Sequence, residues 1–285
     1  MRLSRFTKLA YLALSALPGS IVAATCEAGT PNAMLQNASP KNWVLLALGG
    51  PTDVTVSGSS IISGLGTAFV GLAETGSLTA IGPSSIQSEV LLNMAGRVSR
   101  GSPSYIGPVT QDDDSEQYLS MARKDAISAS ECAAILASTI NLPTVSITNK
   151  SMTIAAEQTL NVVNLRDLIL ENGSLTLSSH AQHDPPPTLI VNISGNFQMS
   201  GSSRIVLEGT LDETHVLFNV TGAGDDVALS GEPGRDGHPT TQISGVLLAP
   251  ARTINLSCAL VSGTVLGGAG SITVGLGSQV IRHFQ

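Results

Sequence analysis

The chain has 285 residues, of which 12% are charged and 3% are aromatic, and it contains 29 glycines. A helix bundle would need many more charged side chains on its wet faces, whereas stacked β-strands need apolar side chains inside and small residues at their corners. The formal net charge of -7, without a Lys/Arg cluster beyond the N-terminus, excludes the basic face that nucleic acids require. We therefore expect a mostly β protein with no nucleic-acid partner.

The first 24 residues have the pattern of a secretory signal peptide. Arg2, Arg5 and Lys8 precede an apolar run over residues 9–17, and residues 22–24 supply the small side chains that a signal peptidase accepts. The run is too short to span a bilayer, and no later apolar stretch reaches about 18 residues. We expect cleavage after Ala24, leaving residues 25–285 as one secreted domain without a transmembrane segment.

Residues 43–94 read as a series of short β-strands. Trp43 to Leu48 is apolar, residues 53–62 alternate around a Gly/Ser corner, and short alternating segments follow at 68–72, 76–81 and 86–94.

Residues 112–139 interrupt this β pattern with a helical one. The aspartates at 112–114 suit the positive end of a helix, and Ser115 with Glu116 adds capping chemistry. Apolar residues then recur at steps of three and four, and Pro143 prevents continuation. The stripe is rich in alanine, which predicts a helix lying close against a flat sheet: Tyr118, Leu119, Ala122, Ala126, Ala129, Ala133, Leu136 and Ile140.

The three cysteines are too few for a disulfide framework and too widely spaced for a metal site. In an exported protein one pair can close. Cys26 and Cys132 are the pair to test, because Cys258 lies in a strand pattern where it can serve as a small core residue.

After Pro143 the β pattern resumes and contains a repeat of two apolar residues, an asparagine and another apolar residue. The asparagines are Asn164, Asn192 and Asn219, and the phrase returns with Ala249, at intervals of 28, 27 and 30 residues. A period in this range is typical of solenoids, in which no single copy can bury its apolar side alone. The sequence thus predicts a right-handed β-helix with one long α-helix packed alongside.

The repeated asparagines allow two interpretations. Their amides could bond between successive coils, as stacked amides do. Alternatively they could carry glycans, since six asparagines stand in Asn-X-Ser/Thr triplets: Asn37, Asn149, Asn172, Asn192, Asn219 and Asn255. Because Asn192 and Asn219 lie within apolar strands, we favour the structural interpretation.

Two constellations could carry other chemistry. His180 and His183 with Asp184 have the spacing of a small metal site, but they lie in a turn before three prolines, so we expect a solvated loop. Asp225 and Asp226, followed by residues 236–238 (Asp-Gly-His), resemble the carboxylates and histidine of pectin-cleaving β-helix hydrolases. That family's Asn-Thr-Asp and Arg-Ile-Lys triplets are missing, since residues 252–254 read Arg-Thr-Ile. We expect no catalytic, cofactor-binding or metal-binding residues.

Residues 145–280 resemble the choice-of-anchor A family of exported bacterial proteins. The resemblance rests on five phrases in order: Val216–Gly222 (VLFNVTG), Val227–Gly231 (VALSG), Gly245–Pro250 (GVLLAP), Thr253–Ser257 (TINLS) and Val261–Val265 (VSGTV). It implies a β-helical, adhesive, collagen-binding-like module without catalytic residues. The expected function is therefore non-catalytic adhesion to an extracellular matrix protein or a polysaccharide.

A second resemblance is to the secreted ice-binding β-helix, which shares the order of early coils, a helix and later coils. It implies binding to ice through a flat, regular face rich in Thr or Ser. Thr153, Thr176 and Thr253 look scattered in the sequence rather than stacked. Ice binding and polysaccharide cleavage stay the two alternatives to adhesion.

Overall fold

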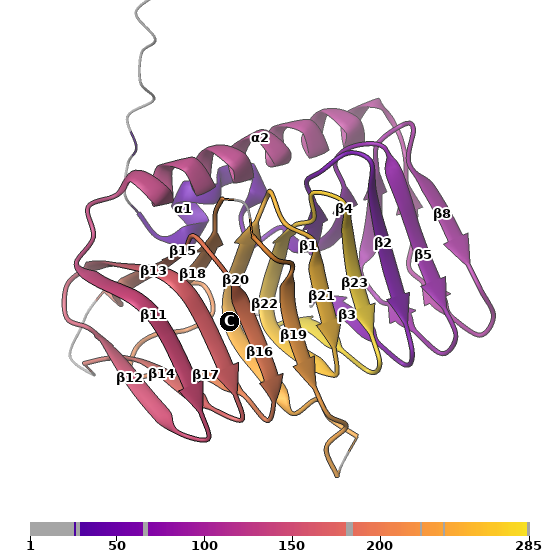
Figure 1. The fold of residues 1–285 in the computed structure, drawn as a ribbon. Helices are drawn as coiled ribbons and strands as arrows, with labels where there is room; N and C mark the ends of the chain where they lie inside the picture. The colour runs from indigo at the N-terminus through magenta and orange to yellow at the C-terminus, as the bar shows by residue number, and fades with distance from the viewer. Residues whose placement is uncertain are drawn as a thin grey trace, which may run out of the picture.

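A computed structural model of the protein describes residues 26, 29–64, 68–180, 185–222, 224–235 and 237–283. Within these residues the chain forms a three-sided coil of parallel β-strands with a long helix, α2 (Asp113–Ile135), along one side (Figure 1). The predicted fold class, a β-helix with a single long helix, is confirmed. A short helix, α1 (Pro31–Leu35), and a 3-10 turn, η1 (Gln36–Ala38), precede the first strand and contact α2.

Three parallel sheets form the sides of the coil, here called faces A, B and C. Face A is built, in spatial order, from β10 (Val109–Thr110), β7 (Glu89–Leu92), β4 (Phe69–Leu72), β1 (Trp43–Ala47), the second halves of β22 (Ala259–Gly267) and β20 (Thr241–Ala249), β18 (Val216–Val220), β15 (Thr188–Ile193) and the first halves of β13 (Leu160–Glu171) and β11 (Ile140–Thr148).

Face B contains, in the same direction, β8 (Arg97–Arg100), β5 (Gly76–Ile81), β2 (Thr52–Ser57), β23 (Ser271–Gly275), β21 (Ile254–Ser257), β19 (Val227–Gly231), β16 (Phe197–Gly201) and the second halves of β13 and β11. Face C contains β9 (Tyr105–Ile106), β6 (Ser85–Ile86), β3 (Ile61–Gly64), β24 (Gln279–Arg282), the first halves of β22 and β20, β17 (Arg204–Glu208), β14 (Ser174–Ser179) and β12 (Ser151–Ala156).

The coils do not follow one another in sequence order along the axis. Strands β1–β10 form an N-terminal block that winds away from the middle of the molecule, and α2 returns the chain along its length (Figure 1). Strands β11–β24 form a C-terminal block that winds back until its last coil docks on the first coil of the N-terminal block. Three parallel pairings make this joint: β1 with β22, β2 with β23 and β3 with β24.

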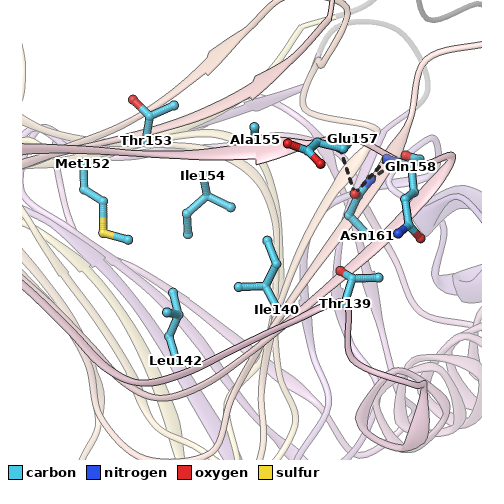
Figure 2. Close-up of a pocket in the computed structure, with 10 residues that line it drawn as sticks. All are labelled: Thr139, Ile140, Leu142, Met152, Thr153, Ile154, Ala155, Glu157, Gln158 and Asn161. Carbon is cyan, nitrogen blue, oxygen red and sulfur yellow. Dashed lines mark hydrogen bonds between the residues drawn. The ribbon is translucent and has the colours of Figure 1, made fainter.

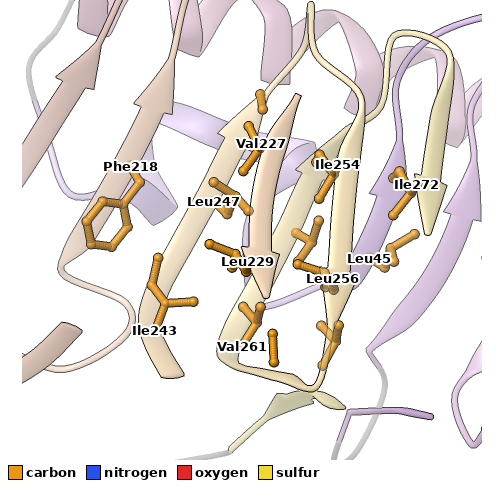
Figure 3. Packing of buried hydrophobic residues seen from close by; sticks show 14 of the residues in the cluster. Leu45, Phe218, Val227, Leu229, Ile243, Leu247, Ile254, Leu256, Val261 and Ile272 are labelled. Atoms are coloured by element: carbon orange, nitrogen blue, oxygen red, sulfur yellow. The ribbon is translucent and has the colours of Figure 1, made fainter. Parts of the chain in front are cut away.

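Apolar side chains at alternate strand positions fill the interior of all three sheets (Figure 3). Val54 and Val56 of β2, for example, are fully buried, whereas Asp53 lies on the outward side of the same strand and is exposed. This alternation follows from the period of two in a β-strand. Phe197 and Phe218 stack inside the core with ring centroids 6.0 Å apart. Complete burial of a side chain of this kind stabilises the fold by about 1.5–3 kcal/mol.

The helix α2 packs on face A through its alanine stripe, as the sequence predicts. The residues of this stripe are buried against apolar side chains of the sheet: Leu119, Ala122, Ala126, Ala129 and Ala133. Gly71 of β4 allows this approach, because a Cβ there would lie 2.4 Å from the Trp43 ring and 2.9 Å from Leu119. The helix is shorter than the predicted range of residues 112–139. It ends at Ile135, and Ile140 already belongs to β11.

The aspartates predicted at the start of the helix do cap it, whereas Ser115 and Glu116 do not supply the capping side chain. The carboxylate of Asp112 is the N-cap, and it accepts a hydrogen bond of 2.8 Å from the Ser115 N–H. This is the usual contact between a capping side chain and the third residue of a helix. The Glu116 carboxylate instead accepts a 3.1 Å hydrogen bond from the Asn93 side chain.

The fourth copy of the repeat is shifted by one residue from the predicted alignment. Asn219 lies opposite Leu248 rather than Ala249. The reason is the corner at Gly245, whose φ of 136° lets β20 continue from face C to face A, and Gly263 repeats it in β22 with φ of 140°. A Cβ at Gly263 would lie 2.1 Å from the Gly245 carbonyl oxygen, so only glycine fits there.

Candidate binding faces

Face A is closed to ligands by α2, so its polar residues have structural roles. Asn164, Asn192 and Asn219 lie in register on neighbouring strands and point towards the helix. Asn219 Nδ2 donates to Asn192 Oδ1 at 2.9 Å, and Asn192 Nδ2 donates to Asn164 Oδ1 at 3.0 Å. This asparagine ladder confirms the interpretation of the repeated Asn as amides that bond between coils.

The asparagine ladder also fixes the helix to the sheet. Asn192 Nδ2 donates to the Ala133 carbonyl at 2.8 Å, one of the last carbonyls of α2, which lack a partner within the helix. Asn219 Nδ2 donates to the Ser130 carbonyl at 2.9 Å, and Ser130 Oγ donates back to Asn219 Oδ1 at 2.6 Å. Asn219 is fully buried and Asn192 is 7% exposed, so neither can hold a glycan in the folded protein.

The disulfide predicted between Cys26 and Cys132 is present, and Cys258 is a buried free thiol. The bond joins the segment before α1 to the last turns of α2. Burial raises the pKa of the Cys258 thiol, which keeps it protonated and inert. The expected signal peptide, residues 1–24, lies outside the described residues.

Face B is a broad open sheet whose outward residues are mostly small and uncharged. Along its middle, one residue per strand faces out in register; we call this set the central column. In spatial order it contains Ser99, Thr79, Thr55, Thr273, Asn255, Ala228, Gln198, Ile169 and Ser146. Figure 1 shows the strands that carry it side by side below α2. Neighbours in such a column are spaced by about 4.7–4.9 Å, the distance between paired strands.

The central column corrects the expectation that the threonines of this chain are scattered. Thr273, Thr55 and Thr79 stack on three consecutive strands, with Ser99 next in line. These strands come from opposite ends of the sequence, so the stacking has no local sequence pattern. On face C, Thr153 also lies opposite Thr176.

A second column along one edge of face B carries its charge. Asp53 lies between Ser271 and Ser77 and accepts a 2.6 Å hydrogen bond from Ser77 Oγ, and Arg97 follows on β8. At the other end of this edge, the backbone N–H of Asn196 donates to Asp167 and holds the pKa of that carboxyl below its usual value. Face B thus presents an uncharged centre with carboxylates and a guanidinium at its margin.

Face C is less uniform than face B. Its outward residues include the bulky apolar side chains of Ile61, Leu260 and Ile281, and Val206 on β17 is 38% exposed beside Arg204 and Glu208. Side chains of such different lengths do not form a flat array. Face B is therefore the stronger candidate for contact with an extended ligand.

The structure does not assemble the hydrolase-like constellation. Asp225 and Asp226 are exposed just before β19, and Asp226 accepts a 2.9 Å hydrogen bond from Asn255. Gly237 and the exposed His238 lie in the loop after β19, and Asp236 lies outside the described residues. The five residues of β19 separate the two groups by about 17 Å at 3.3–3.4 Å per residue. Among the described residues of this region, no pair of converging carboxylates forms.

The predicted solvated loop around His180 is only partly described. His180 is exposed at the end of β14, whereas His183 and Asp184 lie outside the described residues. In the part of the chain that the structure describes, no group of three His, Cys, Asp or Glu side chains could hold a metal ion. Over the same residues, no helix is both long and apolar enough to cross a membrane.

Arg252 is a structural residue that sequence reasoning missed, because it was considered only as part of an incomplete catalytic triplet. Its side chain is 3% exposed and donates to backbone carbonyls of successive coils. Nε donates to Gly222 at 2.8 Å, and Nη2 donates to Gly195 at 2.9 Å and Thr221 at 3.1 Å, while Nη1 donates to Asp225. Arg252 thus connects three consecutive turns between faces A and B.

Comparison with solved structures identifies the same fold in ice-binding proteins. An ice-binding protein from the Antarctic ascomycete Antarctomyces psychrotrophicus is similar with a TM-score of 0.54 and 18% identity, over 88% of this chain and 98% of that chain. An ice-binding protein from an Arctic yeast gives 0.57 and 18%, over 88% and 94%. The DUF3494 domain of ice-binding protein 1 from Shewanella frigidimarina gives 0.53 and 16%, over 88% and 97%. At these identities the likeness shows the fold alone.

Among curated proteins, none matches this sequence significantly. A family model described as "Putative Ice-binding-like adhesive domain" matches residues 31–279. The resemblance to the ice-binding fold is thus confirmed, while the choice-of-anchor A resemblance stays a prediction. The chain belongs to this family of ice-binding-like adhesive domains.

Proposed function

We propose that the protein is a secreted, non-catalytic adhesive domain that attaches through face B to an extracellular polysaccharide. The observation that supports this most is the central column, in which hydroxyl and amide side chains follow one another across the sheet. Its members differ in length and in donor and acceptor character, as Thr55, Asn255 and Gln198 illustrate. A sugar polymer, whose hydroxyls are also mixed donors and acceptors, is the chemical complement of such a surface.

The composition of face B favours a polysaccharide over a matrix protein. Stable protein interfaces depend on a few buried aromatic or arginine anchors surrounded by apolar contacts. No aromatic side chain stands in the central column, and its apolar members, Ala228 and Ile169, are isolated from each other by Gln198. Contact through this face would therefore consist of many hydrogen bonds, each worth about 0.5–1.5 kcal/mol.

Rigidity makes such an array effective. The outward side chains are held on a sheet whose inner side is packed with buried Val, Leu and Ile. A preorganised surface loses little conformational entropy on binding, so weak contacts can add up to a measurable affinity.

The test is a binding isotherm of the purified mature chain on insoluble chitin, cellulose and pectin, with collagen as the protein arm. Saturable binding to a polysaccharide without release of reducing sugar is the expected result. A Thr55→Tyr/Thr273→Tyr variant places two bulky rings on face B and should weaken binding at least tenfold. The matched control is Thr153→Tyr/Thr176→Tyr, which changes a register-paired threonine couple on face C and should bind as the parent does.

Binding to collagen alone, or equal losses for both variants, would contradict the proposal. Release of reducing sugar would favour the hydrolase alternative instead. Tyrosine at these positions is compatible with the fold, because all four threonines are at least partly exposed.

Ice is the second candidate ligand, and one observation favours it specifically. Thr273, Thr55 and Thr79 form a regular threonine stack on three adjacent strands, and the proteins of similar fold are described as ice-binding. The interruption of the column by Ala228 and Ile169 and the charges at its edge make a uniform match to a crystal plane less favourable. Thermal hysteresis that disappears in the Thr55→Tyr/Thr273→Tyr variant, without any polysaccharide binding, would replace the proposed function by this one.

A further inference from the structure

Coil ends of this solenoid dock on one another even where no loop joins their strands directly. The joint between the two blocks is of this kind: β1, β2 and β3 of the first coil pair in parallel with β22, β23 and β24 of the last. Thr52 Oγ1 donates across the joint to the Gly268 carbonyl at 2.8 Å, although 216 residues separate them. An end coil of this molecule is therefore a competent docking surface.

Two further coil ends are open. At one, β8, β9 and β10 pair only with β5, β6 and β7; at the other, β11 and β12 pair only with β13 and β14, as far as the described residues extend. All strands of the three faces run in parallel. A second copy shifted along the axis would therefore present its β8–β10 end to the β11–β12 end of the first in the same parallel sense as the joint within the chain.

The β11–β12 end is apolar enough to receive another coil. It holds a cavity of about 310 Å³, and Figure 2 shows Ile140, Leu142, Met152 and Ile154 pointing into it. Ile140, Leu142 and Met152 are only partly buried, although they occupy interior positions of the coil. Unpaired strand edges next to such a surface are sites where solenoids associate end to end.

The β8–β10 end carries a charge at an interior position. Arg100 lies opposite Ala80 in β5, and Ala80 is fully buried in the core. The same interior column continues through the whole molecule, and each of its other members is buried and apolar: Val56, Val274, Leu256, Leu229, Met199, Leu170 and Ile147. Arg100 is exposed, and no further coil of the described residues covers it.

We propose that Arg100 keeps the protein monomeric by preventing head-to-tail docking of its β8–β10 end onto the β11–β12 end of a second copy. In that arrangement the guanidinium would lie against Ile147, at the end of the apolar column, and would exchange its water for apolar neighbours. Burying an unpaired charge is strongly unfavourable. Inward-pointing charges on edge strands are a known way in which β proteins avoid edge-to-edge association.

The test compares the mature chain with an Arg100→Leu variant by sedimentation equilibrium over about 1–100 µM. The parent should stay monomeric, while the variant should self-associate at least tenfold more tightly, with an average mass that rises with concentration. Arg97→Leu is the matched control: it removes the same charge from the same strand, but at the outward position opposite Ser77, and should stay monomeric. If Arg100→Leu does not fold, Arg100→Gln provides the same comparison.

A double variant identifies the docking partner. Adding Met152→Lys to Arg100→Leu places a charge at the opposite end and should restore the monomer. A folded Arg100→Leu chain that stays monomeric like the parent would overturn the proposal, as would equal association by Arg97→Leu or continued association of the double variant. The proposal is independent of the ligand of face B, since neither end coil needs that ligand in order to dock.

Discussion

Replacing Asn219 by alanine should destabilise the protein more than any other single change in the asparagine ladder. Asn219 is completely buried and takes part in three hydrogen bonds, to Asn192 Oδ1, to the Ser130 carbonyl and from Ser130 Oγ. The truncation leaves the Ser130 hydroxyl and the Asn192 amide oxygen buried with one partner fewer. Each such loss costs about 1–3 kcal/mol. We expect a total of about 2–4 kcal/mol.

The assay is urea unfolding followed by far-UV circular dichroism, with thermal unfolding as a second measurement. At about 2–4 °C per kcal/mol for a domain near this size, the melting temperature should fall by about 5–15 °C. Asn255→Ala is the control, because Asn255 is a strand asparagine on open face B whose amide bonds only to the exposed Asp226. Its effect should stay within about 0.5 kcal/mol.

A double-mutant cycle with Ser130→Ala tests the reasoning itself. If Asn219 acts through its contact with Ser130, the two losses overlap and their sum exceeds that of the double variant by more than about 0.5 kcal/mol. A loss below about 1 kcal/mol for Asn219→Ala, or strict additivity with Ser130→Ala, would refute the view that the ladder attaches α2 to face A.

Three further predictions concern stability. Cys132→Ser should lower the free energy of unfolding by about 2–4 kcal/mol, because it opens a long covalent loop, and chemical denaturation with and without reductant checks this. Arg252→Leu should cost about 3 kcal/mol or more, since several partly buried carbonyls lose a charged donor, while Arg252→Lys should recover only part of this in the same assay. Asp212 makes the stability depend on pH: burial alone would raise its pKa, but hydrogen bonds from Thr214 and His215 (2.6 and 2.7 Å) lower that pKa below its ordinary value. Its stabilising effect is therefore complete above its unfolded pKa and is lost as the pH falls through the lower folded value. The stability difference between parent and Asp212→Asn should shrink as the pH falls from about 5 towards 3, and a difference that grows over this range would contradict the reasoning.

Features that repeat or are local could be predicted from the sequence. The period near 28 residues indicated coils, the alanine stripe from Leu119 to Ala133 indicated a helix close against a sheet, and the context of Cys258 singled out the Cys26–Cys132 pair. The period and the alanine stripe are spacings along the chain, and the cysteine pair follows from the local strand pattern around Cys258, so none of the three needs knowledge of tertiary contacts.

Which coils are neighbours could be known only from the strand pairings in the folded protein. The stacking of Thr273 on Thr55, the interior position of Arg100 and the carbonyl contacts of Arg252 all depend on register between strands that are far apart in sequence. The period predicts the length of a coil but not the order of the coils along the axis. The repeat pattern also does not show that α2 carries the chain back between the two blocks. Because a change of register by one residue moves every side chain to the other side of the sheet, the outward column of face B became visible only once the pairings were known.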